Sequence, residues 1–152
     1  MSDGAIALGL AAVALVVPLA AWLWKLHREP PDSPQRLVGE LRMGHLAALV
    51  LVFVAATHAG LAVARLEVPG AGLEIALAVG FLVFASTAVL REPPDALTWL
   101  ALAFLGHAVL DVLHRPGLLP EAIVPRWFAR DCATLSSVVA AMCYLAVRRR
   151  RG

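Results

Sequence analysis

The sequence predicts an all-α integral membrane protein with five transmembrane helices, on the evidence of its composition and of its evenly sized apolar stretches. Of the 152 residues, 61% are hydrophobic and 16% are charged. A soluble domain has about half apolar and about a quarter charged residues. The mean hydropathy is +0.79. The apolar residues gather in five stretches of about 20 residues, the length that a helix needs to cross a hydrocarbon core of about 30 Å.

The five stretches are predicted to form a single membrane domain. Each is interpreted as a helix, because only helices and closed barrels satisfy their backbone hydrogen bonds in lipid. The alternation of apolar and polar residues that barrel strands require is missing. Prolines and glycines separate the stretches. The predicted spans are approximately 5–24, 44–66, 71–90, 96–114 and 128–147.

The first span is predicted to be retained in the protein and to lie at the edge of the bundle. Ser2 and Asp3 stand where a signal peptide would carry positive charge, and Lys25 follows the apolar stretch. The span has no ionisable side chain, and a long proline-containing loop is expected after it. We therefore expect a four-helix bundle of the second to fifth spans. The first span, with Gly9 suited to close packing, is the expected contact for a partner membrane subunit.

The later spans carry their own boundary signals. Small residues are frequent in the second and third spans, which permits neighbouring helices to approach closely. The fourth span follows Pro93 and Pro94, and Asp95 is placed to cap the N-terminus of its helix. The fifth span is followed by four arginines, residues 148–151, which are typical of a cytoplasmic anchor.

The positive charges predict an orientation. With the N-terminus outside, nine of the 13 lysine and arginine residues fall in segments predicted to be cytoplasmic. This is the asymmetry that the positive-inside rule describes. Five spans then put the C-terminus in the cytoplasm. The compact, loop-poor organisation favours a bacterial inner membrane, with membrane lipid as the surroundings.

Three ionisable residues of the fourth span share one face of the predicted helix. At about 100° per residue, His107, Asp111 and His114 fall within an arc of about 60°. Ionisable groups at membrane depth are costly, so they usually face a protein interior or a water-filled cavity. The predicted orientation places residues of the second, third and fifth spans in the same outer half of the membrane. These residues are His58, Glu74 and Asp131.

This set predicts a divalent metal site for zinc or iron, because imidazole and carboxylate groups are common ligands of such ions. A helical bundle can present such ligands inward from facing helices. The spacing differs from the pair of histidines four residues apart in zinc proteases. The predicted ligands are His107, Asp111, His114 and His58, with Glu74 and Asp131 as supporting or alternative ligands.

Three functions are compatible with the sequence, which leaves open whether the protein is an enzyme. In the first, a metal-bound water acts on a lipid-like substrate that enters sideways, with a spare carboxylate as the base. The second is a non-catalytic accessory subunit of a larger membrane complex. The third is an electron carrier with haem b, in which His58 and His107 are axial ligands and Arg65 reaches the propionates.

A purely structural role is a further alternative, and one class of partner can be excluded. The polar residues can also serve only to hold helices together, because hydrogen bonds between helices stabilise small bundles. The net charge of +2 is small, and the arginines are scattered rather than clustered on one predicted face. Binding to nucleic acid is therefore not expected.

Overall fold

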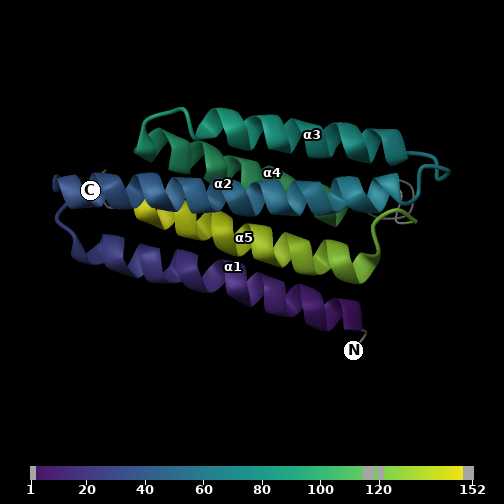
Figure 1. Cartoon of the computed structure of the whole chain (residues 1–152), viewed down its shortest axis with the longest axis horizontal. Coiled ribbons are helices and arrows are strands. Elements are labelled where there is room, and N and C mark those ends of the chain that lie inside the picture. The colour runs from purple at the N-terminus through teal and green to yellow at the C-terminus, as the bar shows by residue number, and fades with distance from the viewer. Residues whose placement is uncertain (1–2, 115–118, 120–121, 149–152) are drawn as a thin grey trace.

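The computed structural model describes residues 3–114, 119 and 122–148, and these residues form five α-helices without a strand. All five helices are long and apolar enough to cross a membrane. This confirms the predicted fold class. The helices are α1 (Asp3–Arg28), α2 (Pro34–Val63), α3 (Ala71–Ala88), α4 (Pro93–Leu113) and α5 (Arg126–Arg148) (Figure 1).

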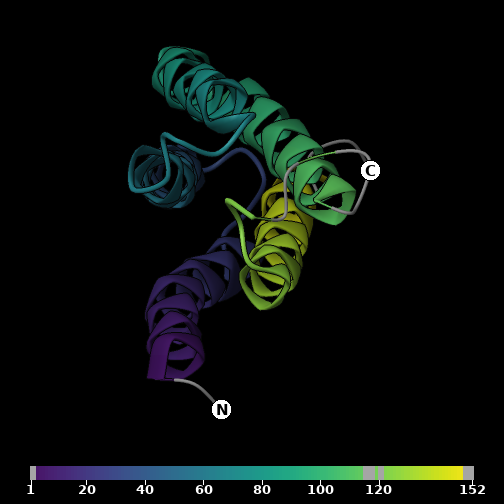
Figure 2. The ribbon, with the colours of Figure 1, turned by 90° about the vertical axis from the view of Figure 1, so that its right-hand side faces the viewer.

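The helices run side by side along the long axis of the molecule, and α1 lies at the edge (Figure 1). The end view in Figure 2 shows α2 to α5 grouped together, with α1 outside this group. Helix α1 packs against α2 and α5. In its most apolar window 6% of the residues are buried, against 28% to 50% in the other four helices. The expectation of a peripheral first helix is confirmed.

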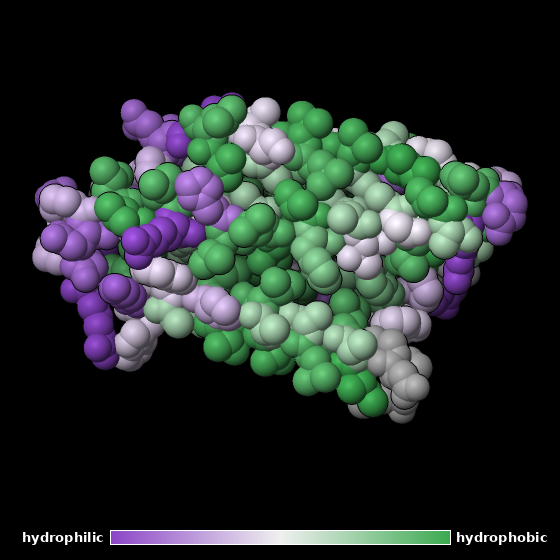
Figure 3. Space-filling view, viewed as in Figure 1, coloured by the Kyte–Doolittle hydropathy of each residue, from purple (hydrophilic) through white to green (hydrophobic). Residues whose placement is uncertain are grey.

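The surface has the distribution of side chains that a bilayer requires. Hydrophobic side chains cover the middle of the face shown in Figure 3, and hydrophilic side chains gather at its two ends. Large apolar side chains are exposed on every helix. In water such a belt would be unfavourable, whereas in lipid it is the expected outer surface.

The connection between α1 and α2 is shorter than the sequence predicted. The second span was expected near Gly44 after a long loop, but α2 begins at Pro34. The Ser33 hydroxyl accepts a hydrogen bond from the Arg36 backbone N–H and caps the helix. Pro34 occupies the first turn, where its missing N–H costs nothing. The first turns of α2 are polar, so a search for apolar residues does not detect them.

The Arg36 side chain connects α2 with α1 and α5. We call the end of the bundle that contains the α1–α2 connection the Arg36 end. The side chains of Arg36 and Glu40 are almost fully buried. Arg36 Nε donates to Glu40 Oε1 at 3.0 Å. Its Nη1 donates to the Leu26 carbonyl at 3.1 Å, and its Nη2 donates to the Ala146 carbonyl at 2.9 Å. The guanidinium thus neutralises the negative ends of α1 and α5.

A close approach between α1 and α2 accompanies this anchor. A Cβ atom placed on Gly39 would lie 2.7 Å from the Leu26 side chain, so glycine permits the contact. Leu19 and Leu26 belong to the main core, which receives side chains from all five helices. Helix α1 is therefore peripheral along its length but held firmly at its C-terminal half.

Candidate metal centre

Five ionisable side chains meet inside the opposite end of the bundle, called the His114 end below. Three helices supply them. The C-terminal ends of α2 and α4 and the N-terminal end of α3 lie at the His114 end. All five are buried, with exposed fractions of 5% or less. We call this group the buried cluster, and its members are His58, Glu74, His107, Asp111 and His114.

One half of the buried cluster is centred on Asp111. Its Oδ2 lies 3.0 Å from His107 Nδ1, and its Oδ1 lies 3.2 Å from His58 Nε2. One ligand atom from each of the three residues lies within 4.8 Å of the others. Tetrahedral zinc ligands with bonds of about 2.0–2.1 Å lie about 3.3 Å apart. The three side chains are therefore already spaced approximately as a metal ion requires.

The other half of the buried cluster is a hydrogen-bonded pair next to His58. His114 Nε2 donates to Glu74 Oε1 at 2.7 Å, and His114 Nδ1 donates to the Leu110 carbonyl at 2.9 Å. Glu74 Oε2 lies 3.7 Å from His58 Nδ1. One ligand atom from each of His58, Glu74 and His114 also lies within 4.8 Å of the other two. Both His114 nitrogens face acceptor oxygens, however, which leaves no lone pair for an ion.

Several atoms in the Asp111 half lack hydrogen bonds. His58 Nε2 and both carboxylate oxygens of Asp111 are buried without a hydrogen-bond partner among the described residues. The contacts of Asp111 with His58 at 3.2 Å and with His107 at 3.0 Å do not have the angles of hydrogen bonds. A buried polar atom left unsatisfied costs about 1–3 kcal/mol. A cavity of about 10 Å³ lies against the cluster, which is close to the space needed for one water molecule or ion.

The arrangement does not suit the haem alternative. The His58 and His107 rings meet edge to face with centroids 4.9 Å apart, whereas a porphyrin between two axial imidazoles needs a wide flat slot. The small cavity beside them has room for an ion. Arg65, expected to reach the propionates, donates to the Ala122 carbonyl instead.

Asp131 is the predicted site residue that the structure does not bring to the cluster. Its side chain is exposed and lines a groove between α1 and α5. The next residue, Cys132, is buried and interacts with the His58 ring. Neighbouring residues of a helix differ in direction by about 100°, so a small error in the expected rotation of α5 exchanges one for the other.

Sequence reasoning also missed the side chains that pack around the cluster. Ser136 is fully buried on α5, and its Oγ lies 3.4 Å from His107 Nδ1. The Phe81 ring packs against His107 and the Phe128 ring packs against His58. The spacing of Cys132 and Ser136, four residues apart on one helix face, was the available signal for this contact.

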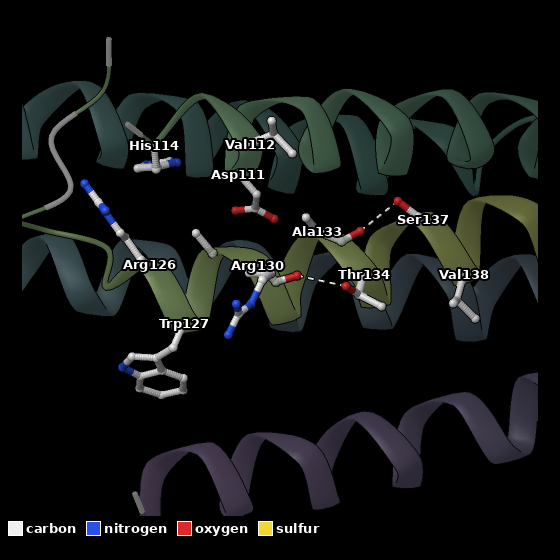
Figure 4. A pocket seen from close by; sticks show the side chains of 11 residues that line it. Asp111, Val112, His114, Arg126, Trp127, Arg130, Ala133, Thr134, Ser137 and Val138 are labelled. Atoms are coloured by element: carbon white, nitrogen blue, oxygen red, sulfur yellow. Dashed lines mark hydrogen bonds between the residues drawn. The ribbon is translucent and has the colours of Figure 1, made fainter. Parts of the chain in front are cut away.

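A groove between α4 and α5 reaches the buried cluster from outside. Its volume is about 1050 Å³, and Asp111 and His114 line it on the α4 side. In Figure 4 Asp111 points from α4 toward α5, and Arg126 reaches toward the end of α4. The α5 side consists of Arg126, Trp127, Ala129, Arg130, Ala133, Thr134, Ser137 and Val138.

The chain was compared with family models, curated proteins and solved structures. No protein-family model matches it, and no curated protein or solved structure matches it either. The geometry of the buried cluster is therefore the basis for assigning a function.

Proposed function

We propose that this membrane protein binds one divalent metal ion, zinc or iron, between His58, His107 and Asp111. The observation that carries the proposal is that the unsatisfied His58 Nε2 and Asp111 carboxylate meet beside an ion-sized cavity. Two imidazoles and one carboxylate form a ligand set that is used for catalytic zinc and for non-haem iron. An ion between them would satisfy all three unpaired atoms.

Glu74 and His114 have a supporting role in this proposal. A carboxylate behind the second nitrogen of a ligating histidine fixes the orientation of the ring and strengthens the metal bond. Glu74 Oε2 stands in this position, 3.7 Å from His58 Nδ1. The 2.7 Å hydrogen bond from His114 holds Glu74 in place. His114 is thus a positioning residue rather than the ligand that the sequence suggested.

The proposal extends to a metal-dependent reaction on a lipid-like substrate. Three protein ligands leave a coordination position open, as is typical of catalytic sites. Asp111 lines the α4–α5 groove, so this side of the site is the accessible one. A divalent ion supplies Lewis-acid polarisation of a bound oxygen. Glu74, the carboxylate of the cluster that is not a proposed ligand, is the candidate proton acceptor.

The metal content of the purified full-length protein tests the proposal. In a gentle detergent we expect one zinc or iron per chain by elemental analysis, and restoration by Zn²⁺ after treatment with a chelator. Asp111→Asn and His58→Gln should each weaken Zn²⁺ binding by about 100-fold or more, equivalent to about 2.7 kcal/mol. His45→Gln and His27→Ala, at the Arg36 end, are the controls and should bind as wild type does.

Three results would contradict this assignment. A protein that binds no ion at micromolar Zn²⁺ has a structural cluster of ion pairs instead. A Soret band in the absorbance spectrum would establish the haem alternative. If His114→Gln removes the ion as completely as His58→Gln does, the metal lies in the Glu74 half of the cluster.

We also propose that the His114 end faces the outside of a bacterial inner membrane and that the C-terminus is cytoplasmic. Nine of the 13 lysine and arginine residues support this orientation. The N-terminus and the end of α5 lie at opposite ends of the bundle (Figure 1). A reporter that is active only in the cytoplasm should therefore work after Gly152 and fail before Met1. The reverse pattern would invert the proposed orientation.

A second candidate function, an accessory subunit, is favoured by the exposed face of α1. Its N-terminal half presents a row of apolar side chains, and Gly9 has open space around it. Such a face suits a partner helix. A cysteine cross-linker at Leu10 should yield an adduct with another protein in native membranes, whereas one at the exposed Val109 of α4 should not. Equal behaviour at both positions would contradict a partner on α1. The exposed row consists of Ile6, Leu10, Val13 and Val17.

A further inference from the structure

The α4–α5 groove has a gradient of polarity along α5. Four of its lining residues are spaced four apart and so lie on one face of the helix, with a rise of about 6 Å between them. From the His114 end toward the middle of the bundle, these positions carry two guanidinium groups, one hydroxyl and one branched alkyl group. These residues are Arg126, Arg130, Thr134 and Val138. In Figure 4 the Arg126 side chain reaches toward α4, and the Arg130 side chain leaves α5 in another direction.

This face of α5 is polar where a transmembrane helix would normally contact lipid. Helix α5 is the most amphipathic and least apolar of the five helices. The exposed side chains on this face include those of Arg130, Thr134 and Ser137. The two hydroxyls donate to carbonyls of their own helix. Within the described part of the chain no residue is hydrogen-bonded to the Arg130 guanidinium, so a charged ligand can still be bound there.

The chemistry of the groove favours a phosphate group. Arginine binds phosphate and carboxylate through two parallel hydrogen bonds, and such pairs are strongest where water is displaced. A volume of about 1050 Å³ is large enough for a head group and part of an alkyl chain. Beyond the arginines, toward the middle of the bundle, the α5 lining is uncharged and ends at Val138. A molecule with a charged head and a hydrocarbon tail matches this order.

We propose that the α4–α5 groove binds a phosphate-bearing amphiphile, with the phosphate at Arg126 and Arg130 and the chain along Val138. The inference rests on the proposed function, because the head group then lies against Asp111 and the metal site. The substrate class is therefore a phosphatidate-like or isoprenoid-phosphate-like molecule, with a terminal phosphate monoester, that enters from the bilayer. A soluble phosphorylated compound would present the same chemistry to the arginines without the chain.

Trp127 lines the groove and provides an internal probe for binding. The full-length protein, with its other three tryptophans replaced by phenylalanine, is titrated in a neutral detergent with short-chain phosphatidate. Phosphatidylcholine of the same chain length and inorganic phosphate are titrated in parallel. We expect a saturable change in Trp127 fluorescence with phosphatidate and at least tenfold weaker binding of phosphatidylcholine. Native mass spectrometry of the wild-type chain gives the same comparison if the tryptophan variant does not fold.

The arginines provide the decisive variants. Arg130→Gln should weaken phosphatidate binding at least tenfold, and the double variant with Arg126→Gln should weaken it further. Arg148 lies at the other end of α5, so Arg148→Gln should leave phosphatidate binding unchanged. Equal binding of phosphatidate and phosphatidylcholine, or binding unaffected by both arginine variants, would overturn the proposal. Inorganic phosphate that binds as tightly as phosphatidate would overturn the membrane source and indicate a soluble phosphorylated ligand.

The same titrations on Asp111→Asn separate this inference from the proposed metal site. If neither this variant nor the wild type binds an ion, but Arg130 still governs phosphatidate binding, the metal proposal fails and the groove proposal stands. If the wild type binds its ion and phosphatidate binding is absent, the groove proposal fails and the metal proposal stands.

Discussion

The two ends of the bundle both bury charged groups, but they treat them differently. At the Arg36 end, Nε and both Nη atoms of the arginine each donate to a fixed oxygen. At the His114 end, the cluster has three imidazoles for two carboxylates. There the Asp111 oxygens and His58 Nε2 have no hydrogen-bond partner in the described chain.

This difference separates a structural role from a binding role. A guanidinium is always charged and has five donors, so it suits the permanent neutralisation of helix ends. Imidazole and carboxylate groups offer lone pairs, which bind metal ions and become costly when they are buried without a partner. Burial of charge is common to both ends, so the candidate site is distinguished by the meeting of two imidazoles and a carboxylate at distances that suit a metal ion.

The largest effect expected from this comparison is on folding stability at the Arg36 end. Arg36→Met should lower the free energy of unfolding by about 3–5 kcal/mol, because it leaves the buried Glu40 carboxylate without its cation. Unfolding by a denaturing detergent measures the change. The metal content of the protein that remains folded should match the wild type.

Arg42 provides the matched control for this variant. It is exposed on the same helix, where its guanidinium packs over Trp22, and Arg42→Gln should change stability by less than about 1 kcal/mol. If Arg36→Met is as mild as Arg42→Gln, the Arg36 end does not anchor the fold.

The fold could be predicted because it depends on the lengths of apolar stretches, whereas the Arg36 anchor could not. Arg36 and Glu40 fall in the loop predicted between the first and second spans. Their partners are carbonyls of Leu26 and Ala146, which become neighbours only after α1 and α5 pack against α2. A buried arginine with backbone partners therefore has no local sequence signal.

The sequence predicted those parts of the candidate site that depend on spacing along one helix, but not those that depend on how the helices are rotated. His107 and Asp111 are four residues apart on one helix, so their contact follows from helical geometry alone. The depth of His58 followed from the predicted topology. The rotation of each helix about its axis did not follow, because it is set by packing across the bundle. For this reason Cys132 rather than Asp131 faces His58, and His114 faces Glu74.

An intermediate effect is expected for Glu74, which separates the two halves of the buried cluster. Glu74→Gln keeps the shape of the side chain but removes the charge behind His58 Nδ1. Loss of such a supporting carboxylate should weaken Zn²⁺ binding by about 10–100-fold, less than the loss expected for Asp111→Asn. Competition with a coloured chelator measures both variants. A greater loss for Glu74→Gln than for Asp111→Asn would make Glu74 a direct ligand.

The smallest effect is expected for Ser136, which touches the cluster through a long contact. Its Oγ lies 3.4 Å from His107 Nδ1, the nitrogen that faces Asp111, so a hydrogen bond between them is weak. Ser136→Ala should change Zn²⁺ binding by about twofold or less, because the hydroxyl competes with the ion for the Nδ1 lone pair only through a long contact. Ser137→Ala is the matched control, because that hydroxyl donates to the Ala133 carbonyl and faces the groove. If Ser136→Ala weakens binding as much as Glu74→Gln, the orientation of His107 depends on α5, and a site organised by α2, α3 and α4 is the wrong description.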